Sequence, residues 1–269
     1  MKKTLLFKAS VITYYVYGDG SEVVFCFHGY GLTGESFAVL QPVLSADHTL
    51  ICIDFPFHGD TNWLEGLFFS DEDLWEILQQ ISPKPNNPFS LLGYSMGGRI
   101  ALHLLQTHPT IINQVALIAP HGLKFNWWQQ VATHTAIGNQ LFRYTMQHPQ
   151  WLLAFIKISS LLHLLNKGRE KFTLGYISDA HERQLLYKRW CAMRAFKPQL
   201  STIRKLINQH KIPVNLLFGE YDQVITTSQG LAFKKEEPLI TVKELKCGHQ
   251  ILKEKYATDV ADLLIKTVK

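Results

Sequence analysis

Short apolar runs that alternate with longer amphipathic stretches are the main pattern of the first 120 residues. The runs at 23–27, 49–54 and 113–120 are nearly continuous in apolar residues, as in strands buried on both faces of a sheet. Between them a helix is predicted from Ser70 to Pro83, because Ser70 precedes an acidic first turn and Pro83 stops the pattern. Strands that alternate with helices predict a parallel sheet covered by helices.

The two ends of the chain add further elements to this predicted sheet. Residues 5–10 and 11–17 are β-rich and are followed by the turn Gly18-Asp19-Gly20, which indicates an antiparallel pair. The remaining predicted elements are helices at 34–44, 226–235 and 250–266 and strands at 212–218 and 239–245.

The alternation stops between residues 121 and 210. No strand-like run interrupts this stretch, whereas apolar helical patterns rich in tryptophan do. We therefore predict a core domain made of residues 1–120 and 211–269, with a helical lid inserted at 121–210.

A Gly-x-Ser-x-Gly pattern lies where a buried run meets a helical stretch. Gly93-Tyr94-Ser95-Met96-Gly97 follows the apolar residues 89–92 and precedes a helix that ends near His108. Such a tight turn requires small residues on both sides of the serine, and it exposes the serine hydroxyl at the end of the sheet. It also sets Ser95 at a helix N-terminus, where free amides stabilise developing negative charge. Ser95 is therefore the candidate nucleophile.

A serine hydroxyl needs a base to take its proton and a carboxylate to orient that base. His249 is the predicted base, because it follows a predicted strand and so emerges at the same sheet edge as Ser95. Asp222 is the predicted acid at the end of the preceding strand, with Glu220 in the same loop as a competing candidate. Asp54, also at a strand end, is interpreted as a structural turn carboxylate.

The oxyanion formed by attack on a carbonyl must meet preformed donors. The backbone N–H of Met96, the residue after the nucleophile, is one candidate. The backbone N–H of Tyr30 is the other, since the neighbouring glycines of His28-Gly29-Tyr30-Gly31 let this loop approach the reacting atom. His28 itself is interpreted as a structural hydrogen-bonding residue and, tentatively, as a substrate contact.

These motifs, in this order, resemble the serine-nucleophile branch of the α/β-hydrolase fold superfamily over nearly the whole chain. The resemblance implies an α/β fold with a mostly parallel eight-stranded sheet covered by helices on both faces, a helical lid, and a triad in the order Ser95, Asp222, His249. Many relatives carry a glycine where this chain has Phe57, and that departure leaves the shape of the loop open. Ser95 excludes the relatives with an aspartate nucleophile, namely the haloalkane dehalogenases and epoxide hydrolases.

Composition narrows the class of protein further. With 269 residues, 46% hydrophobic and 18% charged, the chain is typical of globular proteins with a large core.

The apolar stretch 151–165 is shorter than the roughly 20 residues of a membrane span, and it carries Lys157. Lys8 interrupts the apolar start of the chain, which argues against a signal peptide. A cytoplasmic protein is therefore expected. The four cysteines lack metal-binding or disulfide spacing. No metal, cofactor or nucleic-acid partner is predicted, and the oligomeric state is left open.

Positive charge is concentrated in the predicted lid. Residues 121–210 hold 13 Lys+Arg against 3 Asp+Glu, whereas the whole chain holds 27 against 22. Together with Trp127, Trp128 and Trp151, this pattern favours an amphipathic acyl substrate with an anionic end, or a lid that touches an anionic surface. A solvated basic helix face explains the same pattern. The three tryptophans and Tyr94 are the tentative substrate contacts.

Arg99, one helical turn after Ser95, opens an alternative. The stretch Gly93 to Arg99 is similar to the corresponding turn of 2-succinyl-6-hydroxy-2,4-cyclohexadiene-1-carboxylate synthase of the menaquinone pathway. The similarity implies a lyase in which Arg99 and lid arginines bind substrate carboxylates, and it leaves Arg143, Arg169, Arg183, Arg189 and Arg194 as unassigned candidates. A buried structural arginine is the other interpretation of Arg99. A hydrolase-like ligand receptor without turnover is a third hypothesis for the chain.

Overall fold

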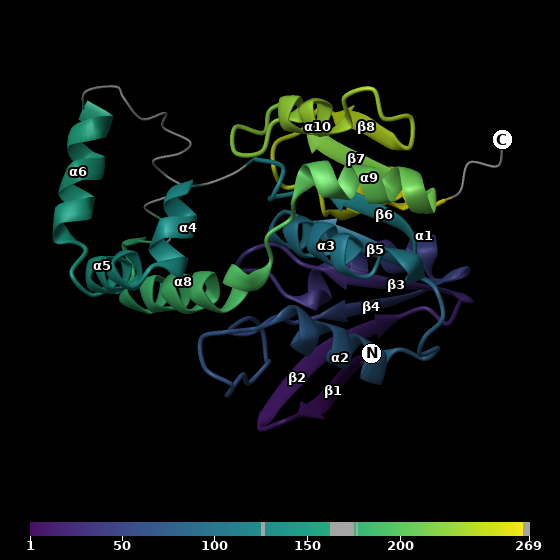
Figure 1. The fold of residues 1–269 in the computed structure, drawn as a ribbon, viewed down its shortest axis with the longest axis horizontal. Helices are drawn as coiled ribbons and strands as arrows, with labels where there is room; N and C mark the ends of the chain where they lie inside the picture. The colour runs from purple at the N-terminus through teal and green to yellow at the C-terminus, as the bar shows by residue number, and fades with distance from the viewer. Residues whose placement is uncertain (125–126, 162–174, 176, 266–269) are drawn as a thin grey trace. The chain divides into compact units, whose positions relative to one another are not determined.

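An eight-stranded sheet is the centre of the first of two units into which the chain divides (Figure 1). The computed structural model describes residues 1–124, 127–161, 175 and 177–265. The first unit comprises residues 1–65, 70–124 and 196–269, and the second comprises residues 66–69 and 125–195.

The strand order of the sheet is β1-β2-β4-β3-β5-β6-β7-β8. The pairs β1–β2 and β2–β4 are antiparallel, and all pairs from β4–β3 to β7–β8 are parallel, as the alternation of strands and helices predicted. The strands are β1 (Lys2–Phe7), β2 (Ser10–Tyr17), β3 (Glu22–Phe27), β4 (His48–Ile53), β5 (Phe89–Tyr94), β6 (Ile112–Ile118), β7 (Val214–Gly219) and β8 (Ile240–Leu245).

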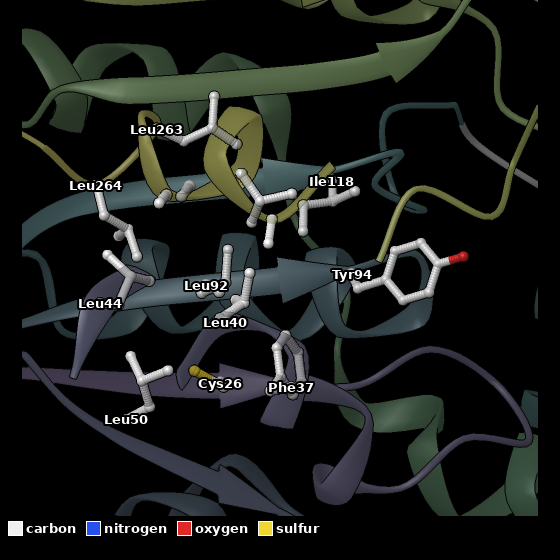
Figure 2. Close-up of a cluster of buried hydrophobic side chains, with 14 of the residues drawn as sticks. Cys26, Phe37, Leu40, Leu44, Leu50, Leu92, Tyr94, Ile118, Leu263 and Leu264 are labelled. Atoms are coloured by element: carbon white, nitrogen blue, oxygen red, sulfur yellow. The ribbon is translucent and has the colours of Figure 1, made fainter. Parts of the chain in front are cut away.

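Helices cover both faces of this sheet. One face carries the 3₁₀ helix η1 (Gly34–Leu40), α1 (Gln41–Leu44) and α11 (Ala257–Ala261), which contact one another. The apolar cluster beneath them joins Phe37 and Leu40 to Cys26 and Leu92 of the strands, because alternate residues of a strand point to the same face (Figure 2). The other helices of this unit are α2 (Asp71–Ile81), α3 (Met96–Thr107), α9 (Leu200–His210) and α10 (Thr227–Lys234).

Helix α3 lies against β3, β5 and β6 and also contacts α9 (Figure 1). Its first turn comes so close to β3 that a Cβ on Gly97 would stand 1.8 Å from the carbonyl oxygen of Phe27, so glycine is required there. The C-terminal half of α3 holds the chain where it returns to this unit. His103 Nδ1 accepts the N–H of Lys197 at 3.2 Å, and Gln106 Oε1 accepts that of Gln199 at 2.7 Å.

The end of the chain differs from the helix predicted at 250–266. The 3₁₀ helix η4 (Glu254–Tyr256) and the short helix α11 replace it. The N–H of Ile251 donates to the carbonyl of His249 at 3.0 Å, and that of Lys253 to the carbonyl of Ile251 at 2.8 Å. These two-residue turns bring the fully buried Ile251 into the core and delay the start of the helix.

Asp54, fully buried after β4, holds the loops around it. Its Oδ1 accepts the N–H of Gly34 at 2.6 Å, and its Oδ2 accepts that of Asp60 at 3.4 Å. Burial raises the pKa of Asp54 to about 6, although both hydrogen bonds act in the opposite direction. The structure thus gives Asp54 the structural position expected from the sequence.

Phe57 lies in the same loop and has φ 64°. It therefore keeps the backbone conformation that a glycine would take, at an expected strain of about 1–3 kcal/mol.

The second unit is helical and has an aromatic cluster of its own. Its described helices are α4 (Trp127–His134), α5 (Ala136–Gln147), α6 (Gln150–Leu161), α8 (Ala180–Ala192) and the 3₁₀ helix η3 (Met193–Ala195). Trp190 lies 5.1 Å from Trp128 and 5.4 Å from Phe142 between ring centroids, which packs α8 against α4 and α5. The division differs from the predicted lid at 121–210, because α9 belongs to the sheet unit and residues 66–69 belong to the helical one.

We expect the buried carboxyl of Asp54 to make the protein more stable in mild acid. Because its pKa is raised above that of an unfolded aspartate, the folded state binds the additional proton between about pH 6 and 4, and unfolding becomes harder as the pH falls through this window. Relative to Asp54→Asn, the wild type should gain about 2 kcal/mol of unfolding free energy between pH 7 and 4.5. Urea denaturation at both pH values measures the difference, and Asp19→Asn, on an exposed turn, should retain the wild-type gain.

Candidate active site

Ser95 occupies a strained corner between β5 and α3. Its dihedral angles, φ 50° and ψ −110°, are unusual for a residue with a side chain. Backbone hydrogen bonds hold the corner: the N–H of Ser95 donates to the carbonyl of Ile118 at 2.9 Å, and the carbonyl of Ser95 accepts from Gly98 at 3.0 Å and from His121 at 2.8 Å. The end of β6, the first turn of α3 and the loop after β6 therefore hold the conformation that the Gly-x-Ser-x-Gly pattern indicated.

Three side chains that are far apart in the sequence form one hydrogen-bonded chain. His249 Nε2 lies 3.1 Å from Ser95 Oγ, and His249 Nδ1 lies 2.6 Å from Asp222 Oδ2. Because a carboxylate only accepts, Nδ1 carries the proton and Nε2 is left to accept from the serine hydroxyl. This is the arrangement in which a histidine can take a proton from the serine.

The carboxylate of Asp222 is held ionised beside His249. Burial would raise the pKa of Asp222, but the hydrogen bonds from His249 and from the amides of Ile225 and Val224 outweigh burial and lower it. Oδ1 accepts the amides of Val224 at 2.8 Å and Ile225 at 3.0 Å, which leaves Oδ2 directed at the imidazole. The competing carboxylate, Glu220, is exposed to solvent.

The residues that carry the two predicted oxyanion donors lie close to the corner. Met96 is the first residue of α3, where a helix has amides without intrahelical acceptors. Gly29 precedes Tyr30, and a Cβ on Gly29 would stand 3.3 Å from Tyr94 Cδ1 and 3.4 Å from Ser95 Cβ. The Gly29–Tyr30 backbone therefore runs next to the serine, as the glycines around it predicted.

Tyr94 contacts the histidine loop. Its hydroxyl donates to the carbonyl of His249 at 3.0 Å, and its ring lies 5.6 Å from the imidazole at an angle of 28°. This support of His249 was not anticipated from the sequence, which offered Tyr94 only as a substrate contact. An aromatic residue next to the nucleophile was the only available signal for it.

Arg99 and His28 are both buried. The Arg99 guanidinium has its pKa lowered to about 10 by burial, and the ideal Cβ position of Gly122 lies 3.1 Å from Arg99 Cγ. His28 is fully buried, with Nε2 accepting from the amide of Phe55 and Nδ1 on the carbonyl of Gly29, so its geometry favours the structural role over the tentative substrate contact. Burial likewise favours the structural interpretation of Arg99.

The remaining tentative substrate contacts lie in the helical unit. Trp127, Trp128 and Trp151 are 67%, 49% and 51% exposed. Among the arginine candidates, Arg183 donates to the carbonyls of Met146, Ile177 and Ser178, and Arg194 donates to those of Leu67 and Cys191. Arg189 is buried, whereas Arg169 lies outside the described residues.

Metal binding and membrane crossing are two other functions on which the structure bears. Among the described residues, no group of three or more His, Cys, Asp and Glu side chains could hold a metal ion. No helix in the described part of the chain has the length and apolar character needed to cross a membrane.

Comparison with known proteins places this geometry in a family. The family model for the alpha/beta hydrolase fold matches residues 22–256. The chain is 30% identical over 224 residues to a pimeloyl-(acyl-carrier protein) methyl ester esterase of Neisseria meningitidis serogroup B, covering 79% of each chain. It is 23% identical over 248 residues to monoacylglycerol lipase abhd6-B of Xenopus laevis, covering 86% of this chain and 71% of that one.

Solved structures agree on the fold. The thioesterase domain from the curacin biosynthetic pathway matches with a TM-score of 0.66 at 18% identity, covering 98% of this chain and 99% of that one. An esterase from Thermogutta terrifontis matches with a TM-score of 0.69 at 14% identity, covering 98% of both chains. The chain therefore belongs to the alpha/beta hydrolase fold family, and it is a hydrolase that acts on ester bonds.

Proposed function

We propose that Ser95, His249 and Asp222 form a catalytic triad that hydrolyses a carboxylic ester or related acyl bond. The observation that carries this proposal is the continuous hydrogen-bonded chain from Asp222 through His249 to Ser95. Two further observations support the proposal: the fixed, strained backbone of Ser95 and the two amides that donate to Asp222. Both position catalytic side chains before the substrate binds.

The proposed reaction has two steps. In the first, Ser95 Oγ attacks the ester carbonyl while its proton passes to His249 Nε2, and the imidazolium then protonates the leaving alcohol as the C–O bond breaks. In the second, water loses a proton to His249 and attacks the acyl-serine, and the imidazolium returns the proton to Ser95 Oγ as the acid is released. In both steps the N–H groups of Met96 and Tyr30 stabilise the oxyanion.

For the substrate, we propose an amphipathic acyl ester with an anionic end. The basic excess of the sequence between residues 121 and 210 supports an anionic group, and the exposed tryptophans of the helical unit support an apolar chain. The name of the Neisseria relative, which states a methyl ester of a pimeloyl group on a carrier protein, fits an ester borne by a long acyl chain.

Contact of the helical unit with an anionic surface belongs to the same proposal. Three of its helices have exposed apolar residues at spacings of one helical turn, and they carry Arg143 and Lys157 but no acidic residue among the described positions 127–161. These residues are Trp127 and Val131 of α4, Ile137, Leu141 and Tyr144 of α5, and Trp151, Phe155 and Ile158 of α6.

The two other hypotheses receive less support. The lyase alternative needs Arg99 at the substrate, whereas the structure buries this residue in α3. The receptor alternative needs ligand binding without turnover, and a triad aligned for proton transfer does not favour it.

Ser95→Ala should abolish ester hydrolysis, since it removes the oxygen that attacks the ester in the first step of the proposed mechanism. We expect kcat for a p-nitrophenyl ester to fall by about 10⁴-fold or more. The matched control Ser201→Ala, at an exposed position of α9, should retain wild-type turnover. Turnover by Ser95→Ala at the wild-type rate would refute the triad.

Asp222→Asn and Glu220→Gln separate the two acid candidates. Loss of the Asp222 carboxylate removes the group that fixes the imidazole tautomer, so kcat should fall by about 10³–10⁴-fold. Glu220→Gln, two residues away in the same loop, should stay near the wild-type rate because the structure directs Asp222 at His249. Steady-state kinetics on both purified variants decide the assignment. A larger loss of kcat in Glu220→Gln than in Asp222→Asn would contradict it.

Matched ester series test the anionic end of the substrate. Monomethyl esters of dicarboxylic acids should have kcat/KM about tenfold above methyl esters of monocarboxylic acids of the same length, because a basic surface attracts them. This advantage should shrink as salt rises from 0.05 to about 0.5 M. Equal kcat/KM in both series at every salt concentration would refute the anionic end and leave the triad untouched.

A further inference from the structure

Tyr94, the residue before Ser95, connects the end of β5 with the loop that carries His249. It is buried and belongs to the apolar cluster of the sheet unit. Figure 2 shows its ring at the end of β5, with the hydroxyl directed away from the other labelled side chains. That hydroxyl donates to the carbonyl of His249 at 3.0 Å. The same carbonyl accepts the N–H of Ile251 at 3.0 Å, and its two lone pairs allow both bonds.

The loop of His249 has to reach across the sheet to meet Ser95. It follows β8, the last strand in the sheet order, whereas Ser95 follows β5, three strands away. Neighbouring strands lie about 4.8 Å apart, so the span from β8 to β5 is about 14 Å. Near β7 the loop is held by the N–H of Tyr221, which donates to the carbonyl of Cys247 at 2.9 Å. At β5 it is held by the hydroxyl of Tyr94.

The ring of Tyr94 also limits where the imidazole of His249 can lie. The two ring centroids are 5.6 Å apart, with an angle of 28° between the planes. The ideal Cβ position of Gly29 lies 3.3 Å from Cδ1 and 3.4 Å from Cε1 of the tyrosine, so the backbone of Gly29 leaves this ring little room to move. A fixed ring next to the imidazole restricts its rotation and helps to keep Nε2 at 3.1 Å from Ser95 Oγ.

We propose that Tyr94 is a positioning residue for ester hydrolysis, which ties the loop of His249 to β5 and so holds the imidazole within reach of Ser95. The inference rests on the proposed function, because it assigns Tyr94 to the base of that mechanism. Tyr94 and Ser95 are consecutive, so one short segment carries the nucleophile and also fixes the group that takes its proton. A displacement of about 1 Å can slow such a reaction about 100-fold.

Tyr94→Phe removes the hydroxyl and keeps the ring. Because the loop of His249 loses this attachment to β5, we expect kcat for a p-nitrophenyl ester to fall about tenfold, while KM changes less than about twofold. The matched control is Tyr17→Phe, which removes the hydroxyl of another buried tyrosine of the same apolar cluster, on β2, and should keep the wild-type kcat. A folded Tyr94→Phe protein with the wild-type kcat would overturn the proposal.

The leaving group separates positioning of the base from contact with the substrate. The imidazolium has to protonate departing methanol, whereas p-nitrophenolate departs without a proton. Tyr94→Phe should therefore lower kcat/KM about three- to tenfold more for a methyl ester than for the p-nitrophenyl ester of the same acid. The Ki of the product acid should stay near the wild-type value. Equal losses for the two esters, or a Ki that rises as much as kcat/KM falls, would indicate a substrate contact and overturn the proposal.

Two unnatural side chains at position 94 keep the test decisive if Tyr94→Phe does not fold. 4-Aminophenylalanine carries an N–H donor in place of the hydroxyl, whereas 4-methylphenylalanine fills a similar volume without a donor. The amine should keep kcat within about threefold of the wild type, and the methyl group should lower it about tenfold. Equal or reversed values would also overturn the proposal.

Ser95→Ala distinguishes failure of this inference from failure of the proposed function. Ester turnover that survives Ser95→Ala at the wild-type rate would refute the proposed function itself. Loss of turnover in Ser95→Ala, together with a folded and fully active Tyr94→Phe protein, would refute only the role of Tyr94.

Discussion

The close approach of α3 to the end of β3 is the constraint on which the arrangement around Ser95 depends. With no side chain at Gly97, the first turn of the helix rests on the carbonyl of Phe27. This contact brings the residues that follow β3 next to the residues that follow β5. A methyl group at this position would separate the two backbones, and with them the loop of Tyr30 and the nucleophile.

The remaining groups reach this place because parallel strands end at the same edge. Asp222 follows β7, His249 follows β8, and each is held by backbone groups of its own loop or by Tyr94. The free energy that holds the site is thus spread over the sheet and its loops. The supporting contacts reach the backbone of Ser95 and His249 and the carboxylate of Asp222.

The sequence was sufficient for the parts of this structure that depend on local pattern. Continuous apolar runs predicted the buried strands, and the Gly-x-Ser-x-Gly motif predicted the corner. Ser95, Asp222 and His249 each follow a strand, and the structure joins their side chains by hydrogen bonds. Family membership and ester hydrolysis, expected from the same motifs, agree with the comparisons.

Other features depend on tertiary contacts that no pattern encodes. The amphipathic periodicity at 250–266 predicted a long helix. In the structure the first residues of this stretch form turns instead, and these turns bury Ile251. Helix α9 has the same helical pattern as its neighbours, and its contacts with α3 and with the 3₁₀ helix η2 (Pro109–Ile111) assign it to the sheet unit. The hydrogen bond from Tyr94 to His249 joins residues 155 positions apart, a distance at which periodicity carries no information.

The anchoring of the returning chain on α3 has an evolutionary consequence. The backbone amides of Lys197 and Gln199 donate hydrogen bonds to the side chains of His103 and Gln106. This attachment to α3 therefore does not depend on the side chains of the residues that precede Lys197. Most of the helical unit is one continuous insertion, residues 125–195, and the hydrogen bonds of Lys197 and Gln199 lie just after its C-terminal end. Such a segment can diverge in length and composition without disturbing these two hydrogen bonds or the corner of Ser95.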